Sequence, residues 1–266
     1  DRRHVVRVPV DRATPEVLTP GDGLEWTPFY TGDGASIAHI SATPKRPPVV
    51  TVMNASGSRE PRLLTANRIP ADFPTERLVV PRQVIFNAPD GTRVHAQIFD
   101  NGASGRRPAI IYVHGGPPRQ MLLGWNYSDY YSNAYATNQY LASKGFIVMS
   151  VNYRLGIGYG RDFHHPAAGG REGASEYQDV KAGAEWLRRQ SNVDPRRIGI
   201  YGESYGGYLT ALALARDSDL FAAGVDVHGV HDFTVGRAES LSGGSRDSYE
   251  VGAAAARALE IMWHAS

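Results

Sequence analysis

One serine in this chain lies in a setting that would make it a nucleophile. The segment Gly202-Glu203-Ser204-Tyr205-Gly206 follows a short apolar run and precedes a run of small and apolar residues. A G-x-S-x-G pattern between a buried strand and a helix is typical of a nucleophile elbow, a strained turn that lifts the serine Oγ clear of a sheet. The N-terminus of the helix that follows favours developing negative charge. We therefore predict that Ser204 is the catalytic nucleophile.

A glycine-rich loop earlier in the chain could stabilise the charge that such a nucleophile creates. Tyr112-Val113-His114-Gly115-Gly116-Pro117 continues directly from another apolar run. Backbone amides must approach an oxyanion closely, and glycines leave room for that approach. We expect the oxyanion donors to be the amides of Tyr205 and Gly116; the alternative is a tight turn without chemistry. The residues predicted to support the elbow and the loop are Gly202, Gly206, Gly207, His114 and Gly115.

The elements that must position these residues alternate between strands and helices from about residue 79 onward. Strands are predicted at 82–88, 93–100, 109–113, 146–151, 197–201 and 222–227, and helices at 130–144, 174–189 and 209–216. This alternation favours a mostly parallel sheet covered on both faces, the α/β class. The motif and the layout together predict an α/β-hydrolase sheet over residues 79–266, lacking its C-terminal strands.

Residues 1–78 follow a different pattern, with short strands separated by turns. Val5-Val6-Arg7-Val8 with Leu18-Thr19, and Val49-Val50-Thr51-Val52 with Leu64-Thr65, form two similar pairs offset by about 45 residues, a length that suits a β-propeller blade. We predict that residues 1–78 are the last blades of a β-propeller. Two unrelated hairpins would be the alternative.

Several of these segments resemble the prolyl oligopeptidase family of serine peptidases, in particular its acylaminoacyl- and dipeptidyl-peptidase-like bacterial members. They are Asp90-Gly91-Thr92, His114-Gly115-Gly116-Pro117, Tyr153-Arg154, Gly158-Tyr159-Gly160 and residues 202–208. The resemblance implies a β-propeller joined to an α/β-hydrolase domain, cleavage of short peptides, and no cofactor. It also implies that the propeller restricts access to the site.

The chain departs from this family at two places. His114 stands where prolyl oligopeptidases and dipeptidyl peptidases proper have a tyrosine whose hydroxyl helps to hold the oxyanion. Thr234-Val235-Gly236, after Phe233, replaces the tyrosines that line the proline pocket of dipeptidyl peptidases. A backbone donor must therefore serve in place of the missing hydroxyl, and a preference for proline is not expected.

A serine nucleophile also needs a histidine base and a carboxylate that orients it, in the chain order Ser, acid, His. We expect both partners beyond Ser266, so that the sequence is a fragment and inactive by itself. Asp226 or Asp232 with His264 would be the alternative triad. His228 and His231 invite a metal interpretation, but a loop with so few ligands favours ordinary hydrogen bonding, and no metal site is predicted.

Composition excludes some functions. The chain has 266 residues, no cysteine, and 28 basic against 27 acidic residues, so disulfides and a cysteine nucleophile are excluded. This balanced charge does not suggest nucleic acid or an anionic membrane as a partner, and no apolar run is long enough to span a membrane. The expected partner is a peptide substrate. Compartment and oligomeric state are not indicated.

The sequence thus predicts a serine-type peptidase that works through an acyl-enzyme on Ser204. An esterase with the same fold is an alternative, because the same elbow and loop serve esters. A non-catalytic hydrolase-like binding protein is another.

Overall fold

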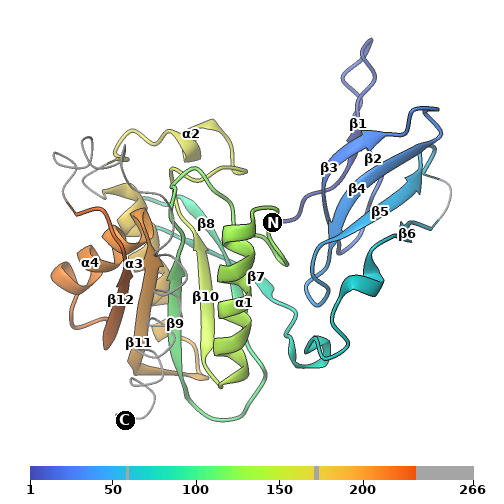
Figure 1. Cartoon of the computed structure of the whole chain (residues 1–266). Coiled ribbons are helices and arrows are strands. Elements are labelled where there is room, and N and C mark those ends of the chain that lie inside the picture. The colour runs from blue at the N-terminus through green and yellow to red at the C-terminus, as the bar shows by residue number, and fades with distance from the viewer. Residues whose placement is uncertain (58–59, 171–173, 232–266) are drawn as a thin grey trace. The chain divides into compact units, whose positions relative to one another are not determined.

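The computed structural model describes residues 1–57, 60–170 and 174–231, and the chain divides into two compact units. One unit is Asp1–Pro81 with Leu122–Gln139, and the other is Arg82–Met121 with Tyr140–Ser266. Figure 1 shows the elements of each unit. The predictions for Asp232, Phe233, Thr234-Val235-Gly236 and His264 lie outside the described residues.

The second unit contains a six-stranded mixed sheet with the order β12-β11-β9-β10-β8-β7 (Figure 1). Its strands are β7 (Arg82–Asn87), β8 (Arg93–Phe99), β9 (Arg107–Val113), β10 (Ile147–Asn152), β11 (Val193–Glu203) and β12 (Ala223–Val227). β10, β9, β11 and β12 pair in parallel, whereas β8 pairs antiparallel with both of its neighbours, β10 and β7. This is the predicted α/β-hydrolase sheet.

The strands at the centre of the sheet are apolar and buried on both faces. Every residue of β9 and of β10 is buried, as their continuous apolar runs predicted. The second unit contains α2 (Arg161–His164), α3 (Ser175–Arg188) and α4 (Tyr205–Arg216), whereas α1 (Asp129–Ser143) begins in the first unit. α3 buries the predicted face of Tyr177, Val180, Ala184 and Leu187 in the core of the sheet.

The first unit is built of antiparallel strands. A two-stranded sheet pairs β1 (Val6–Arg7) with β2 (Glu16–Val17). A four-stranded sheet has the order β3 (Leu24–Tyr30), β4 (Ser36–Ala42), β5 (Val49–Asn54) and β6 (Arg62–Leu63). Two short 3₁₀ helices, Ala66–Arg68 and Thr75–Arg77, follow.

The sequence repeat in this unit corresponds to a repeated set of hydrogen bonds. The amide of Val5 donates to Thr19 Oγ1 at 2.9 Å, and the amide of Val50 donates to Thr65 Oγ1 at 2.9 Å. The amide of Leu18 donates to the carbonyl of Val5 at 2.8 Å. In the same way, the amide of Leu64 donates to the carbonyl of Val50 at 2.8 Å. The β1–β2 pair is therefore equivalent to the β5–β6 pair, and β3 to β6 form one four-stranded blade. This is part of a β-propeller.

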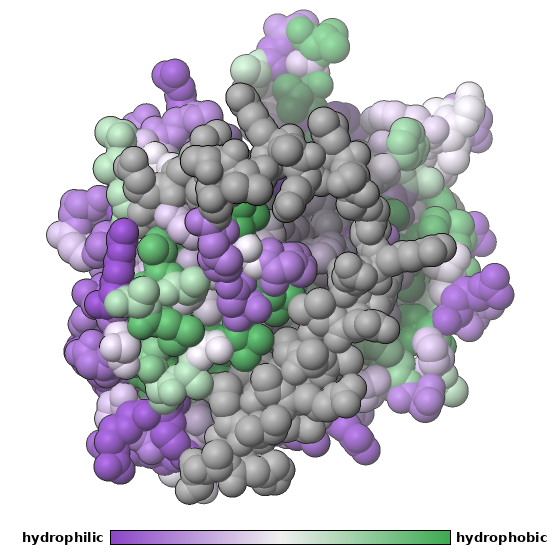
Figure 2. Space-filling view, turned by 60° about the vertical axis from the view of Figure 1, so that its left-hand side comes forward, coloured by the Kyte–Doolittle hydropathy of each residue, from purple (hydrophilic) through white to green (hydrophobic). Residues whose placement is uncertain are grey.

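The described surface is mixed in character. Figure 2 shows hydrophilic and hydrophobic residues interspersed on the face that it presents. Among the described residues, no helix has the length and apolar character needed to cross a membrane.

Candidate active site

Ser204 lies on a strained turn between a strand and a helix. β11 ends at Glu203 and α4 begins at Tyr205, so Ser204 alone connects them. Its φ of 55° and ψ of −116° are unusual for a residue with a side chain and cost about 1–3 kcal/mol. The Ser204 amide is held by the carbonyl of Val227 at 3.0 Å, at the end of β12. The prediction of a sharp turn at this serine is confirmed.

The glycines of the elbow lie where no side chain would fit. A Cβ on Gly202 would be 2.5 Å from Val113 O, and one on Gly206 would be 2.0 Å from the same oxygen. A Cβ on Gly207 would lie 2.3 Å from Asp226 Oδ1. The elbow is therefore pressed against the end of β9, where the glycine-rich loop begins. The structure brings the two predicted motifs together.

Aromatic side chains hold the glycine-rich loop in place. His114 is fully buried, and its ring stacks on Tyr153 with centroids 4.3 Å apart. Tyr153 Oη donates to the His114 carbonyl at 2.6 Å. Burial lowers the pKa of His114 to about 4, so this imidazole is neutral near pH 7 and supports the loop instead of carrying charge. Gly116 has a φ of 117°, in the region that favours glycine.

Glu203, directly before the serine, was not singled out from the sequence. Its side chain is buried and accepts a hydrogen bond from Tyr112 Oη at 2.5 Å. Burial raises the pKa of Glu203 to about 7, although hydrogen bonds from Tyr112 and from the Gly115 backbone act in the opposite direction. An acidic residue directly after the buried, uncharged run 198–202 was the signal that could have identified it.

Tyr205 is the first residue of α4, in the turn whose amides have no carbonyl partner within the helix. Its hydroxyl donates to Glu176 Oε1 at 2.6 Å and to the Gly170 carbonyl at 2.5 Å. Burial, followed by the contact with Glu176, raises the pKa of this phenol well above its usual range. The side chain of Tyr205 is thus anchored on the start of α3.

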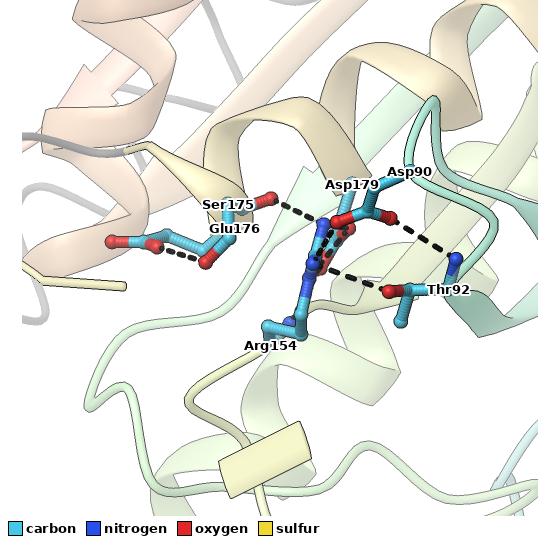
Figure 3. Close-up of polar contacts among 6 residues, drawn as sticks. All are labelled: Asp90, Thr92, Arg154, Ser175, Glu176 and Asp179. Atoms are coloured by element: carbon cyan, nitrogen blue, oxygen red, sulfur yellow. Dashed lines mark hydrogen bonds and ion pairs between the residues drawn. The ribbon is translucent and has the colours of Figure 1, made fainter. Parts of the chain in front are cut away.

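Arg154 belongs to a network of ion pairs (Figure 3). Its guanidinium binds the buried Asp179 at 2.7 Å and also binds Asp90, Thr92 and the Ser175 carbonyl. The hydrogen bond from Arg154 lowers the pKa of Asp90 to about 2, while burial raises that of Asp179 to about 6. Arg154 therefore has a structural role, which ties the loop after β10 to the start of α3.

The described residues leave the catalytic base unassigned. No imidazole in the described ranges is hydrogen-bonded to Ser204 Oγ. Asp226, which the sequence offered as an alternative acid, pairs with His231 Nε2 at 2.5 Å and accepts the Gly229 amide at 2.8 Å. Residues 1–57, 60–170 and 174–231 contain no group of three or more His, Asp or Glu side chains arranged to hold a metal ion.

This mixed sheet, with a serine elbow between β11 and α4, defines the α/β-hydrolase class. The model of the prolyl oligopeptidase family matches residues 132–241. The chain is 35% identical over 130 residues to dipeptidyl aminopeptidase BIII of Pseudoxanthomonas mexicana, a match over 49% of this chain and 17% of that protein. It is 30% identical over 189 residues to an uncharacterized peptidase of Bacillus subtilis (strain 168), over 66% of this chain and 27% of the relative.

A solved acylaminoacyl peptidase, in complex with Z-Gly-Gly-Phe-chloromethyl ketone, has the same architecture. It superposes with a TM-score of 0.66 and 26% identity, covering 84% of this chain and 34% of that one. The chain thus spans only a part of the length of its relatives. Residues 132–241 thus match the prolyl oligopeptidase family, and the relatives that the chain resembles include dipeptidyl and acylaminoacyl peptidases.

Proposed function

We propose that this chain carries the nucleophile half of the active site of a serine peptidase that hydrolyses short peptides. The observation that carries the proposal is the strained backbone of Ser204, with Gly202 and Gly206 pressed against Val113. A serine held in this way presents its hydroxyl to a substrate at the end of the sheet. The peptidases among its relatives support an amide as the bond that is cleaved.

In the proposed reaction, Ser204 Oγ attacks the peptide carbonyl and forms an acyl-enzyme that water then hydrolyses. A histidine accepts the serine proton and returns it to the leaving amine. The amides of Tyr205 and Gly116 hold the oxyanion, and each such donor contributes about 3–4 kcal/mol in the transition state. No cofactor enters these steps.

The Gly116 amide suits this role because its neighbours in the loop are already engaged. The carbonyl of His114 accepts from Tyr153, and the carbonyl of Gly115 accepts from His114 Nδ1 at 2.8 Å. The amide of Gly116 has no hydrogen-bond partner among the described residues. It remains available to an oxyanion.

We also propose that the domain boundary lies close to residue 79, with propeller blades before it and the hydrolase domain after it. The blade hydrogen bonds extend to Thr65, and the hydrolase sheet begins at Arg82. Residues 122–139 group with the first unit, and they would then be a segment inserted into the sequence of the hydrolase domain after β9.

Labelling with a fluorophosphonate probe tests the nucleophile. The natural protein in its longest form should be labelled, and Ser204→Ala should not be. Labelling that persists in Ser204→Ala would refute the assignment. We expect the 266-residue chain alone to turn over no substrate, because Ser204 has no base among its described neighbours.

A comparison of substrates tests the type of bond. The natural protein should hydrolyse aminoacyl-p-nitroanilides as well as p-nitrophenyl esters. Turnover of the esters alone would identify an esterase, and absence of labelling would identify a hydrolase-like binding protein.

A further inference from the structure

Glu176 is a fully buried carboxyl group close to the start of α3. It is the second residue of this helix and is 0% exposed. Glutamates are almost never buried to this extent unless polar partners surround them. Here Oε1 accepts from Tyr205 Oη at 2.6 Å and from the Gly170 amide at 3.1 Å, and Oε2 accepts from Ser175 Oγ at 3.1 Å (Figure 3). Two of these partners lie close to Glu176 in the sequence, whereas Tyr205 belongs to another helix, α4.

The bond to Glu176 completes the fixing of the Tyr205 side chain. Tyr205 is 8% exposed, and its ring stacks on that of Tyr153, with centroids 6.5 Å apart and an angle of 22° between the planes. The ring also meets Tyr208 edge to face, with centroids 5.5 Å apart. Its hydroxyl lies between Glu176 Oε1 and the Gly170 carbonyl. A tyrosine side chain has only two rotatable bonds, so a fixed ring and a fixed hydroxyl also fix the Cα of Tyr205.

Tyr205 supports the strained turn of the nucleophile on the side of α4. Ser204 has a φ of 55°, and a residue persists in such a conformation only where its surroundings impose it. On the side of the sheet, the Val227 carbonyl accepts from the Ser204 amide at 3.0 Å. On the side of α4, the anchored phenol of Tyr205 holds the next residue. The nucleophile thus lies between two fixed points, one at the end of β12 and one at the start of α3.

We propose that Glu176 is a positioning residue, which holds the Tyr205 hydroxyl and thereby sets both Ser204 Oγ and the Tyr205 amide for attack on a carbonyl. This role rests on the proposed function of Ser204. Glu176 is fully buried, so it acts through Tyr205 and not by contact with a substrate. A displacement of about 1 Å at the reacting atoms costs about 100-fold in rate, so a loosened turn should be visible in catalysis.

Three variants of the longest natural form of the protein test this role, with an aminoacyl-p-nitroanilide as substrate. Tyr205→Phe keeps the ring and the backbone amide but removes the hydroxyl, and Glu176→Met keeps the length of the side chain but removes both acceptor oxygens. Each should lower kcat by about 10- to 100-fold with KM changed less than about twofold, since uniform binding is retained. Glu176→Gln retains an oxygen that accepts from the hydroxyl, so its kcat should stay within about threefold of the wild type. Where Glu176→Met does not fold, Tyr205→Phe decides, because it leaves the buried ring in place.

The double variant, Tyr205→Phe with Glu176→Met, shows whether the two residues act through one contact. Its kcat should lie within about twofold of that of the slower single variant, because the same interaction is removed only once. Two losses of kcat that multiply would mean that Glu176 affects catalysis by a route other than the Tyr205 hydroxyl. That result would overturn the proposal.

The matched control is Tyr177→Phe. The hydroxyl of Tyr177 donates to Asp217 Oδ2, and this pair also joins α3 to α4, but at the end of α4 that lies away from Ser204. Tyr177→Phe should lower the thermal midpoint, as Tyr205→Phe does, and should leave kcat unchanged. An equal loss of kcat in Tyr177→Phe would show that catalysis follows the stability of the two helices, and it would overturn the positioning role.

The outcomes separate this proposal from the function on which it rests. The fluorophosphonate labels Ser204 without any peptide, and labelling of Tyr205→Phe and Glu176→Met should slow in parallel with kcat. A wild-type kcat in both variants, with Ser204 still labelled, would refute the positioning role alone. A wild-type protein that is not labelled, or a Ser204→Ala variant that is labelled, would refute the function of Ser204 and leave Glu176 with a structural role.

Discussion

At the level of single residues, Gly206 lies where a side chain of any size would collide with the backbone of β9 and its loop. A Cβ there would lie 2.0 Å from Val113 O and 2.8 Å from His114 O, both of them backbone atoms. We expect Gly206→Ala to lower the free energy of unfolding by about 1–3 kcal/mol or more, because the elbow must separate from β9. Denaturation in urea measures this loss.

The matched control for this substitution is Gly32→Ala. A Cβ at Gly32 has no heavy atom within 4 Å, and Gly32 has no positive φ. The free energy of unfolding of Gly32→Ala should stay within about 0.5 kcal/mol of that of the wild type. Equal stability of the two variants would contradict the close approach of the elbow and the loop.

Glu203 makes stability depend on pH near neutrality. Burial raises its pKa from 4.5 to about 7, so the folded state binds this proton more tightly than the unfolded state does. The resulting stabilisation is complete below about pH 4.5 and is lost as the pH rises through about 7. At about 1.4 kcal/mol per pKa unit, the loss approaches about 3 kcal/mol.

The comparison with Glu203→Gln isolates this contribution. Between pH 5 and pH 8, the free energy of unfolding of the wild type should fall relative to that of the variant. Urea denaturation at each pH measures the difference. A difference between the two proteins that is the same at every pH would contradict the raised pKa.

At the level of elements, the Arg154 network joins the loop after β10 to the start of α3. Asp179 is fully buried, and Arg154 supplies its positive partner (Figure 3). Arg154→Met would leave this carboxylate without a cation, which costs about 3–5 kcal/mol for a buried pair. We expect a loss of that order in the free energy of unfolding.

A second substitution checks the cause. Arg154→Met combined with Asp179→Asn should regain part of the lost stability, since no buried charge then remains unpaired. Arg93→Met, at an exposed residue of β8, is the neutral control. A double variant no more stable than Arg154→Met would show that packing, and not the ion pair, determines the cost.

The elements themselves could be predicted from apolar periodicity to a large extent. The predicted strand 109–113 lies within β9, and the predicted helix 174–189 exceeds α3 by one residue at each end. The order of the strands could not be predicted, because periodicity does not say that β10 lies between β9 and β8. The same limit applies to the site: spacing indicated Ser204 and Gly116, whereas the contact of Glu203 with Tyr112 depends on the register of β11 against β9.

At the level of the whole molecule, the repeat in the first unit predicts equivalent effects at distant positions. Thr19 and Thr65 each accept a hydrogen bond from a strand amide, those of Val5 and Val50. Replacing either threonine by valine should cost about 0.5–1.5 kcal/mol. Amide exchange should become faster at Val5 in Thr19→Val and at Val50 in Thr65→Val.

These two variants serve as controls for each other, since each should leave the other amide unchanged. Faster exchange at both amides in a single variant would show that the two sheets open together. No change at either amide would contradict the equivalence of the two copies.

The edge of the blade at β3 has a consequence for association between copies of the chain. Its register shifts between Trp26 and Phe29, Thr27 has a φ of 54°, and the strand contains Pro28, which has no amide to donate. Phe29 and Tyr30 are exposed on this strand, at 66% and 59%. An incoming strand would find neither a straight backbone nor an unbroken row of donors, so this edge resists the growth of intermolecular sheets despite its aromatic surface.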